Sequence, residues 1–167
     1  MEAGQLLKSE PASFQLSLRI RHPSVDPAVL SRELKIEAEH SFRAGAPRPS
    51  RSGLAPEGCH SESYWLATLN PAAWLADVSF TEQPALRFAH VRMGAALSER
   101  LGWALSVTAI HLRRSHAAFL DRLKIEGGQV SLLVAQSPAV SSFSLAPEVS
   151  RIFGELGITL EFELTDE

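Results

Sequence analysis

The chain has 167 residues and a mass of 18.2 kDa, and 45% of its residues are hydrophobic while 21% are charged. This composition is typical of a soluble globular protein, and it excludes collagen-like, low-complexity and disordered chains. The formal net charge of −3 and the pI of about 6.1 argue against a general nucleic-acid-binding protein, which usually carries a strongly basic face.

The cysteine count and the N-terminal residues indicate the compartment. The single cysteine, Cys59, excludes an intramolecular disulfide framework and suits a reducing environment. The first residues carry neither the basic nor the apolar segment of a secretion signal. No apolar run approaches the roughly 18 residues that a membrane-spanning helix needs. We therefore expect a cytoplasmic protein with no membrane partner, built from a tail over residues 1–12 and one domain over residues 13–167.

The first half of the chain alternates between strands and a helix. Residues 13–21 are predicted to form a strand, because apolar and polar side chains alternate along it. A helix is predicted to begin at Asp26-Pro27, since Asp is a good N-cap and Pro is tolerated at the first helical position. Alternation predicts further strands at 36–42 and 62–69, and the Gly, Pro, Ser and Arg residues of 43–61 predict a long loop between them.

Helices dominate the middle of the chain. Apolar side chains recur at spacings of three and four over residues 84–103 and again over residues 112–124, which predicts two amphipathic helices. Gly127-Gly128 is expected to end the second of them. Residues 104–111 lie between the two predicted helices, and the sequence does not assign them a secondary structure.

The C-terminal part again combines strands with a helix. Val130–Ala135 is predicted to be an interior strand, and Phe143 and Leu145 mark a short extended piece. The last helix is expected to begin at Pro147 and to end at Gly157, before an alternating strand over 158–164. These elements predict an α+β fold, with a mixed or antiparallel sheet, helices packed on one face, and an arrangement related to the ferredoxin-like sandwich.

Several short motifs resemble those of a family of small bacterial proteins. They are His22-Pro23-Ser24-Val25-Asp26-Pro27, Arg43-Ala44-Gly45-Ala46-Pro47-Arg48, Ser63-Tyr64-Trp65, and Phe143-Ser144-Leu145-Ala146-Pro147-Glu148 followed by Leu156-Gly157-Ile158. That family is catalogued as a domain of unknown function, and the resemblance covers residues 13–164 apart from the section 70–112. It implies a compact cytosolic α+β domain, and it implies no catalytic residues.

The predicted loop over residues 43–61 is the first candidate site. Arg43, Arg48 and Arg51 lie close together, and no acidic residue occurs between residues 43 and 56. Guanidinium groups match the geometry of phosphate and carboxylate, so the loop could bind an anion or an acidic partner. A solvated loop whose arginines keep it soluble is the alternative. Arg19 and Arg21 are expected to project nearby, from the polar face of the first strand.

Aromatic and histidine side chains next to this loop complete the candidate ligand-binding set. Tyr64 and Trp65 could form an aromatic platform with Trp74, although their β-propensity and their size favour a role in the core. His60 follows Cys59, but neighbours in sequence rarely point at each other, so the pair does not by itself indicate a nucleophile and its base.

Catalytic and metal-binding patterns are otherwise absent from the sequence. The histidines are spread over the chain without His-Glu-x-x-His or Cys-x-x-Cys spacing, so we predict neither a metal nor a cofactor. No Gly-x-Ser-x-Gly motif or phosphate-binding glycine motif occurs, and we predict no catalytic residue. The acidic pairs Glu37/Glu39 and Glu161/Glu163 are explained by a solvated sheet face. The six histidines are His22, His40, His60, His90, His111 and His116.

Three functions stay open from the sequence. The first is a binding or interaction module that contacts a protein or a small anionic ligand through the loop 43–61. The second is a small enzyme that acts on an anionic molecule, with His60 or His40 as the base. The third is a homo-oligomeric protein, for example a homodimer. Binding without catalysis is the interpretation that we carry forward, and we do not expect nucleic acid as the partner.

Overall fold

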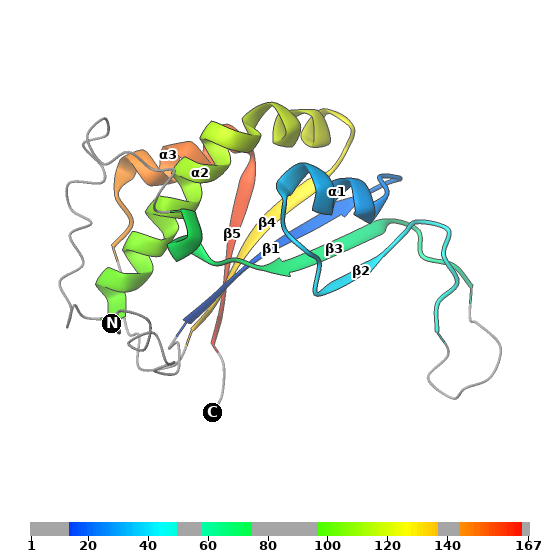
Figure 1. Ribbon diagram of the computed structural model, residues 1–167, viewed down its shortest axis with the longest axis horizontal. Coiled ribbons are helices and arrows are strands. Elements are labelled where there is room, and N and C mark those ends of the chain that lie inside the picture. The colour runs from blue at the N-terminus through cyan, green and yellow to red at the C-terminus, as the bar shows by residue number, and fades with distance from the viewer. Residues whose placement is uncertain (1–13, 50–57, 75–96, 137–143, 165–167) are drawn as a thin grey trace, which may run out of the picture.

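Five strands form one sheet within residues 14–49, 58–74, 97–136 and 144–164, the part of the chain that a computed structural model describes (Figure 1). The strands are β1 (Phe14–His22), β2 (His40–Phe42), β3 (Ser63–Thr68), β4 (Gln129–Gln136) and β5 (Ile158–Leu164). The helices are α1 (Pro27–Leu34), the 3-10 turn η1 (Pro71–Trp74), α2 (Leu97–Ile125) and α3 (Pro147–Leu156).

The sheet has the order β2-β3-β1-β4-β5. β1 runs antiparallel to β3 and to β4, β2 runs antiparallel to β3, and β5 is parallel to β4. Thus β3 lies between β1 and β2, and β1 lies between β3 and β4, so two β-α-β units interleave. Helix α3 connects the parallel pair β4 and β5. Helices α1, α2 and α3 all lie on one side of the sheet (Figure 1), which confirms the α+β class; the finer ferredoxin-like relationship stays a prediction.

Alternation along β1 decides which side chains face the helices. Leu16, Leu18 and Ile20 are buried beneath the helices, while Arg19 and Arg21 point to the opposite side of the sheet. The strands predicted at 13–21, 62–69, 130–135 and 158–164 are present, and no boundary differs from the prediction by more than one residue. We call the side of the sheet that faces away from the helices the open face.

Helix α1 begins where its sequence predicts, and β2 is shorter than predicted. The Asp26 carboxylate accepts a hydrogen bond from the backbone N–H of Ala28 at 2.9 Å, so it caps the helix. Lys35 ends the helix in the left-handed conformation. After Lys35 the chain stays close to the end of α1, because the N–H of Ile36 donates a hydrogen bond to the carbonyl of Ser31. Only residues 40–42 of the predicted strand 36–42 therefore pair with β3.

One helix, α2, occupies much of the region where two were predicted. It runs unbroken from Leu97 to Ile125, so the section 104–111, which the sequence left unassigned, is helical, while residues 84–96 lie outside the described part. Every residue from Ala104 to Leu112 is buried, so this section has no polar face and no amphipathic period. The buried hydroxyls inside it bond to backbone carbonyls one turn earlier.

Helices α2 and α3 end just before glycines, as predicted. Gly127, with φ of +87°, prevents α2 from continuing, and Gly157, with φ of +69°, is the C-cap of α3. Pro147 opens α3. Of the short extended piece expected near the start of this helix, Phe143 lies outside the described residues, and Leu145 lies in an irregular stretch rather than in a strand.

Candidate functional site

Aromatic side chains gather at the β2–β3 end of the open face. Phe42 on β2 stands directly opposite Tyr64 on β3, and His40 stands opposite Leu66. Trp65, the next residue along β3, is fully buried on the helix side, so Tyr64 must point to the open face. Strand alternation and register together place these rings side by side.

The rings form a continuous stack. The Phe42 ring lies 3.7 Å from the His60 ring at an interplanar angle of 18°, and 5.1 Å from the Tyr64 ring at 12°. The His40 ring meets those of Tyr64 and Phe42 edge-on, at 5.8 and 6.1 Å. These four residues are the aromatic stack. Three of its residues are half-buried and His40 is exposed, so part of the stack is accessible from solvent.

His60 reaches the stack because the predicted loop is partly folded back on itself. Its backbone N–H donates to the carbonyl of Ala46 at 2.9 Å, and its carbonyl accepts from the N–H of Gly45 at 2.8 Å. Farther out, the N–H of Arg48 bonds to the carbonyl of Gly58 at 3.0 Å. Residues 43–49 and 58–60 therefore form two paired segments, which we call the arm, and the arm holds the imidazole over Phe42.

The arginines predicted in this loop have different surroundings. The Arg43 guanidinium lies 3.4 Å from the carboxylate of Asp26, the residue that caps α1. Arg48 lies exposed on the arm, and Arg51 falls outside the described residues. Since Arg43 has an acidic neighbour, its charge is partly compensated, and anion binding by these three residues stays a prediction.

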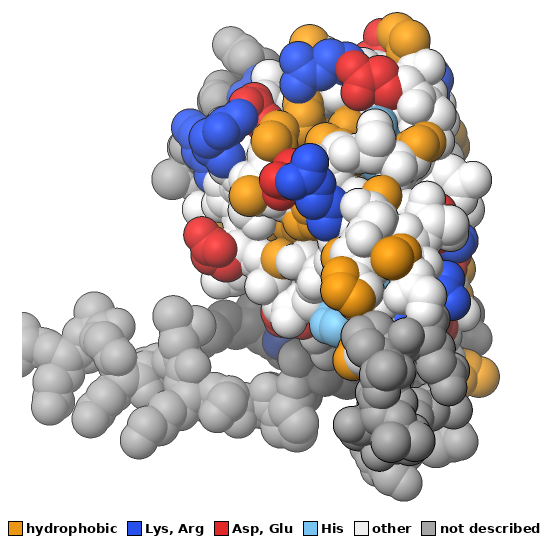
Figure 2. Space-filling model, turned by 90° about the vertical axis from the view of Figure 1, so that its right-hand side faces the viewer, with side chains coloured by type: hydrophobic (Ala, Val, Ile, Leu, Met, Phe, Trp, Pro, Cys, Tyr) orange, Lys and Arg blue, Asp and Glu red, His pale blue; other side chains and the backbone are white. Residues whose placement is uncertain are grey.

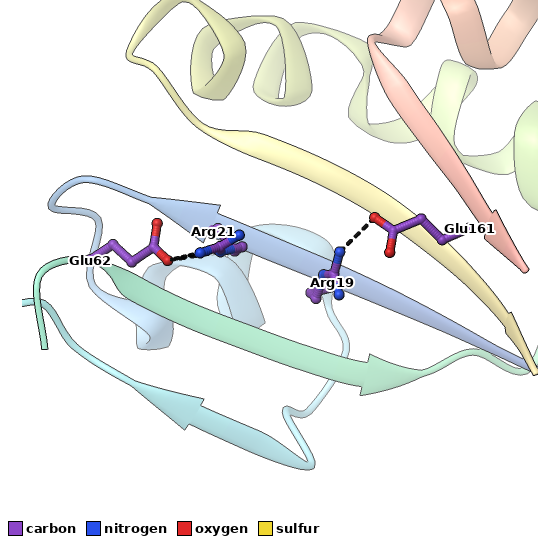
Figure 3. A network of polar contacts seen from close by, with 4 residues as sticks. All are labelled: Arg19, Arg21, Glu62 and Glu161. Carbon is purple, nitrogen blue, oxygen red and sulfur yellow. Dashed lines mark hydrogen bonds and ion pairs between the residues drawn. The ribbon is translucent and has the colours of Figure 1, made fainter. Parts of the chain in front are cut away.

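The arginines of β1 are also paired on the open face (Figure 3). Arg19 bonds to Glu161 of β5 at 2.5 Å, reaching across β4. The Nε of Arg21 bonds to Glu62, just before β3, at 2.8 Å. Both arginines project from the polar face of the strand as predicted, but each has a carboxylate partner. Such partly exposed pairs each contribute up to about 1 kcal/mol, and they leave this part of the face nearly neutral.

Tyr64 and Trp65, which the sequence suggested as parts of one aromatic platform, lie on opposite faces of the sheet. Trp65 is part of the core, and its indole Nε1 donates to the Ser31 hydroxyl of α1 at 3.0 Å. Trp74 lies on η1 and stacks on His111 of α2 at 4.2 Å. Of the predicted ligand-binding residues, the structure brings together His60 and Tyr64, with Arg43 and Arg48 on the arm nearby.

Phe42 is the site residue that sequence reasoning missed. The alternation of residues 36–42 predicted a strand without marking Phe42 as a site residue, and the register with β3 places Phe42 on the open face beside Tyr64. A cavity of about 440 Å³ adjoins Phe42 and extends to the start of α1. Its walls include the charged groups Asp26, Glu37 and Arg43, so it is a polar depression beside the aromatic stack.

A second ring cluster lies inside the protein rather than at this surface. His111 and His116 of α2 meet edge-to-face at 5.4 Å, and both are almost fully buried. Burial lowers the pKa of His116 below its ordinary value of 6.5, and the nearby charges of His111 and Lys35 lower it further, while Glu33 acts in the opposite direction. This cluster is packed inside the protein, and it is separate from the aromatic stack.

Further observations limit the chemistry available in the described segments. Their His, Cys, Asp and Glu side chains form no group of three or more that could hold a metal ion. None of the helices described is long and apolar enough to cross a membrane. A scan against known protein families, together with searches of the curated proteins and of the solved structures, found no match.

Proposed function

We propose that the protein is a binding module that contacts a protein partner through the aromatic stack and the adjoining arm. The observation that supports this proposal is the stack itself, in which Phe42, His60 and Tyr64 cluster on the open face of the sheet. Aromatic side chains are enriched at the centres of protein interfaces, where a partner covers them.

The surroundings of the stack have the composition of an interface rim. Arg21 stands opposite Tyr64 in the register and forms a partly exposed ion pair with Glu62, and Arg48 adds an exposed guanidinium on the arm. Figure 2 views the molecule from this end, and it shows hydrophobic and histidine side chains together, with several basic side chains touching acidic ones. A polar, charge-balanced rim around an apolar centre fits a protein surface better than it fits a small anion.

The geometry favours binding over catalysis as the role of this site. An enzyme acting on an anion would place its base beside free cationic groups, yet the His60 ring is stacked flat on Phe42 and Arg43 lies beside a carboxylate. The rigid rings, held by strand register and by the arm, lose little conformational entropy when a partner covers them.

A display experiment with matched variants tests the proposal. Peptides are selected from a random library against the wild-type protein, and their affinities are then measured for Tyr64→Ala, Phe42→Ala and the control Thr159→Ala. Thr159 is an exposed residue on the open face at the far edge of the sheet. We expect truncation of either ring to weaken binding about tenfold or more, as for central interface residues, and the control to leave it unchanged.

Two results would contradict the proposal. One is a selection that enriches no peptide above a counter-selection with the Tyr64→Ala/Phe42→Ala double variant. The other is a set of peptides that bind all three single variants with equal affinity. Circular dichroism melting of each variant ensures that weaker binding does not reflect unfolding.

A further inference from the structure

The outer edge of β5 is a second surface, at the opposite edge of the sheet from the aromatic stack. Among the described residues, β5 pairs only with β4, in parallel and along its whole length of seven residues. The outer side of such a strand presents a row of backbone N–H and C=O groups, which can accept another extended segment. A ligand that pairs with these backbone groups must supply an extended segment.

Side chains of two kinds alternate along this edge. Leu160, Phe162 and Leu164 point toward the helix side, and their exposure increases along the strand, to 45% at Phe162 and 68% at Leu164. Helix α3 packs against β5, and Ile158 at the start of the strand is buried. An added strand would find apolar side chains to contact on this side, mainly along the second half of β5.

The open-face side of the same edge is acidic. Glu161 and Glu163 alternate there with Thr159, and Arg19 compensates Glu161 (Figure 3). Glu163 is exposed, and none of the ion pairs found in the described residues includes it. Antiparallel pairing of β5 with a second copy of itself would set these acids in one ladder, and facing like charges are destabilising.

We propose that the outer edge of β5 binds an extended segment of a partner protein in which basic and apolar residues alternate. The backbone hydrogen bonds of strand addition hold the segment, its basic side chains pair with the acidic residues on the open face, and its apolar side chains cover Phe162 and Leu164. This surface is separate from the aromatic stack, so the proposal does not depend on the proposed function.

Two synthetic peptides of equal length test this proposal, one alternating lysine with valine and one alternating glutamate with valine. Binding to the full chain is measured by fluorescence anisotropy, and the contact is mapped by amide hydrogen exchange along Ile158–Leu164. We expect the lysine peptide to bind the wild-type protein and to protect amides of β5. Glu163→Lys is expected to weaken that binding about fivefold and to strengthen binding of the glutamate peptide.

The control is Glu39→Lys, which makes the same charge change at an exposed residue next to β2. The proposal requires this variant to bind the lysine peptide as the wild-type protein does. Equal weakening by the two variants would mean general charge attraction and would overturn it. Failure of the lysine peptide to bind, protection away from β5, or a peptide-free dimer with protected β5 amides would overturn it as well.

Discussion

Tyr64 and Trp65 lie on opposite faces of β3, so we expect their truncation to lower the free energy of unfolding by different amounts. Trp65 is fully buried and donates a hydrogen bond to Ser31, so Trp65→Ala removes a large core side chain and that bond. Its cost is expected to be about 4 kcal/mol, as for other buried aromatic residues. Tyr64→Ala removes a half-buried ring that stacks on Phe42 and meets His40 edge-on, and it is expected to cost about 1 kcal/mol.

Urea denaturation of the two variants and the wild-type protein measures this difference directly. Tyr64→Phe serves as the control, because it keeps the ring on Phe42 and removes only the phenol hydroxyl. Its unfolding free energy is expected to stay within about 0.5 kcal/mol of the wild-type value. Equal losses for Tyr64→Ala and Trp65→Ala would refute the assignment of these residues to opposite faces, and with it the position of the aromatic stack.

Two further expectations concern the helices. The pKa of His116 is lowered chiefly by burial, so between that lowered pKa and 6.5 the folded protein binds fewer protons than the unfolded chain does. The free energy of unfolding should therefore have its full value above pH 6.5 and fall as the pH drops through this window. In urea titrations at several pH values, His116→Gln should flatten this pH dependence. A Cβ on Gly128 would lie 2.7 Å from the backbone carbonyl oxygen of Leu123, so Gly128→Ala is expected to lower the free energy of unfolding by about 2 kcal/mol. A Cβ on Gly154 of α3 would have nothing within 4 Å, so Gly154→Ala should raise the melting temperature slightly.

Local patterns in the sequence predicted most of the secondary structure. Alternation along residues 13–21 identified β1 and its buried face, because Leu16, Leu18 and Ile20 lie beneath the helices while the polar side chains between them are on the other side of the sheet. Asp26 and Pro27 marked the start of α1 through capping that depends on neighbouring residues alone. The centre of α2 escaped prediction for the converse reason. It is buried on every side, and hydrophobic periodicity exists only where a helix has a polar face.

The candidate site was predictable only in part, since its contacts join segments that are distant in the sequence. Tyr64 and His60 were identified as candidates, but nothing local shows that Phe42 lies between them; that follows from the register of β2 with β3. The sequence likewise suggested free arginines, whereas Arg43 meets Asp26 only after the chain has turned through α1 and β2. Pairing of this kind is set by tertiary structure.

The most direct test of the proposed function is amide chemical-shift mapping of the labelled protein with a peptide obtained by selection. The largest shifts are expected at His40, Phe42, His60 and Tyr64, with smaller ones along the arm, and they should disappear in the Phe42→Ala variant. Largest shifts on α2 or α3, or shifts at the stack that persist unchanged in that variant, would contradict the proposal that the aromatic stack is the contact surface.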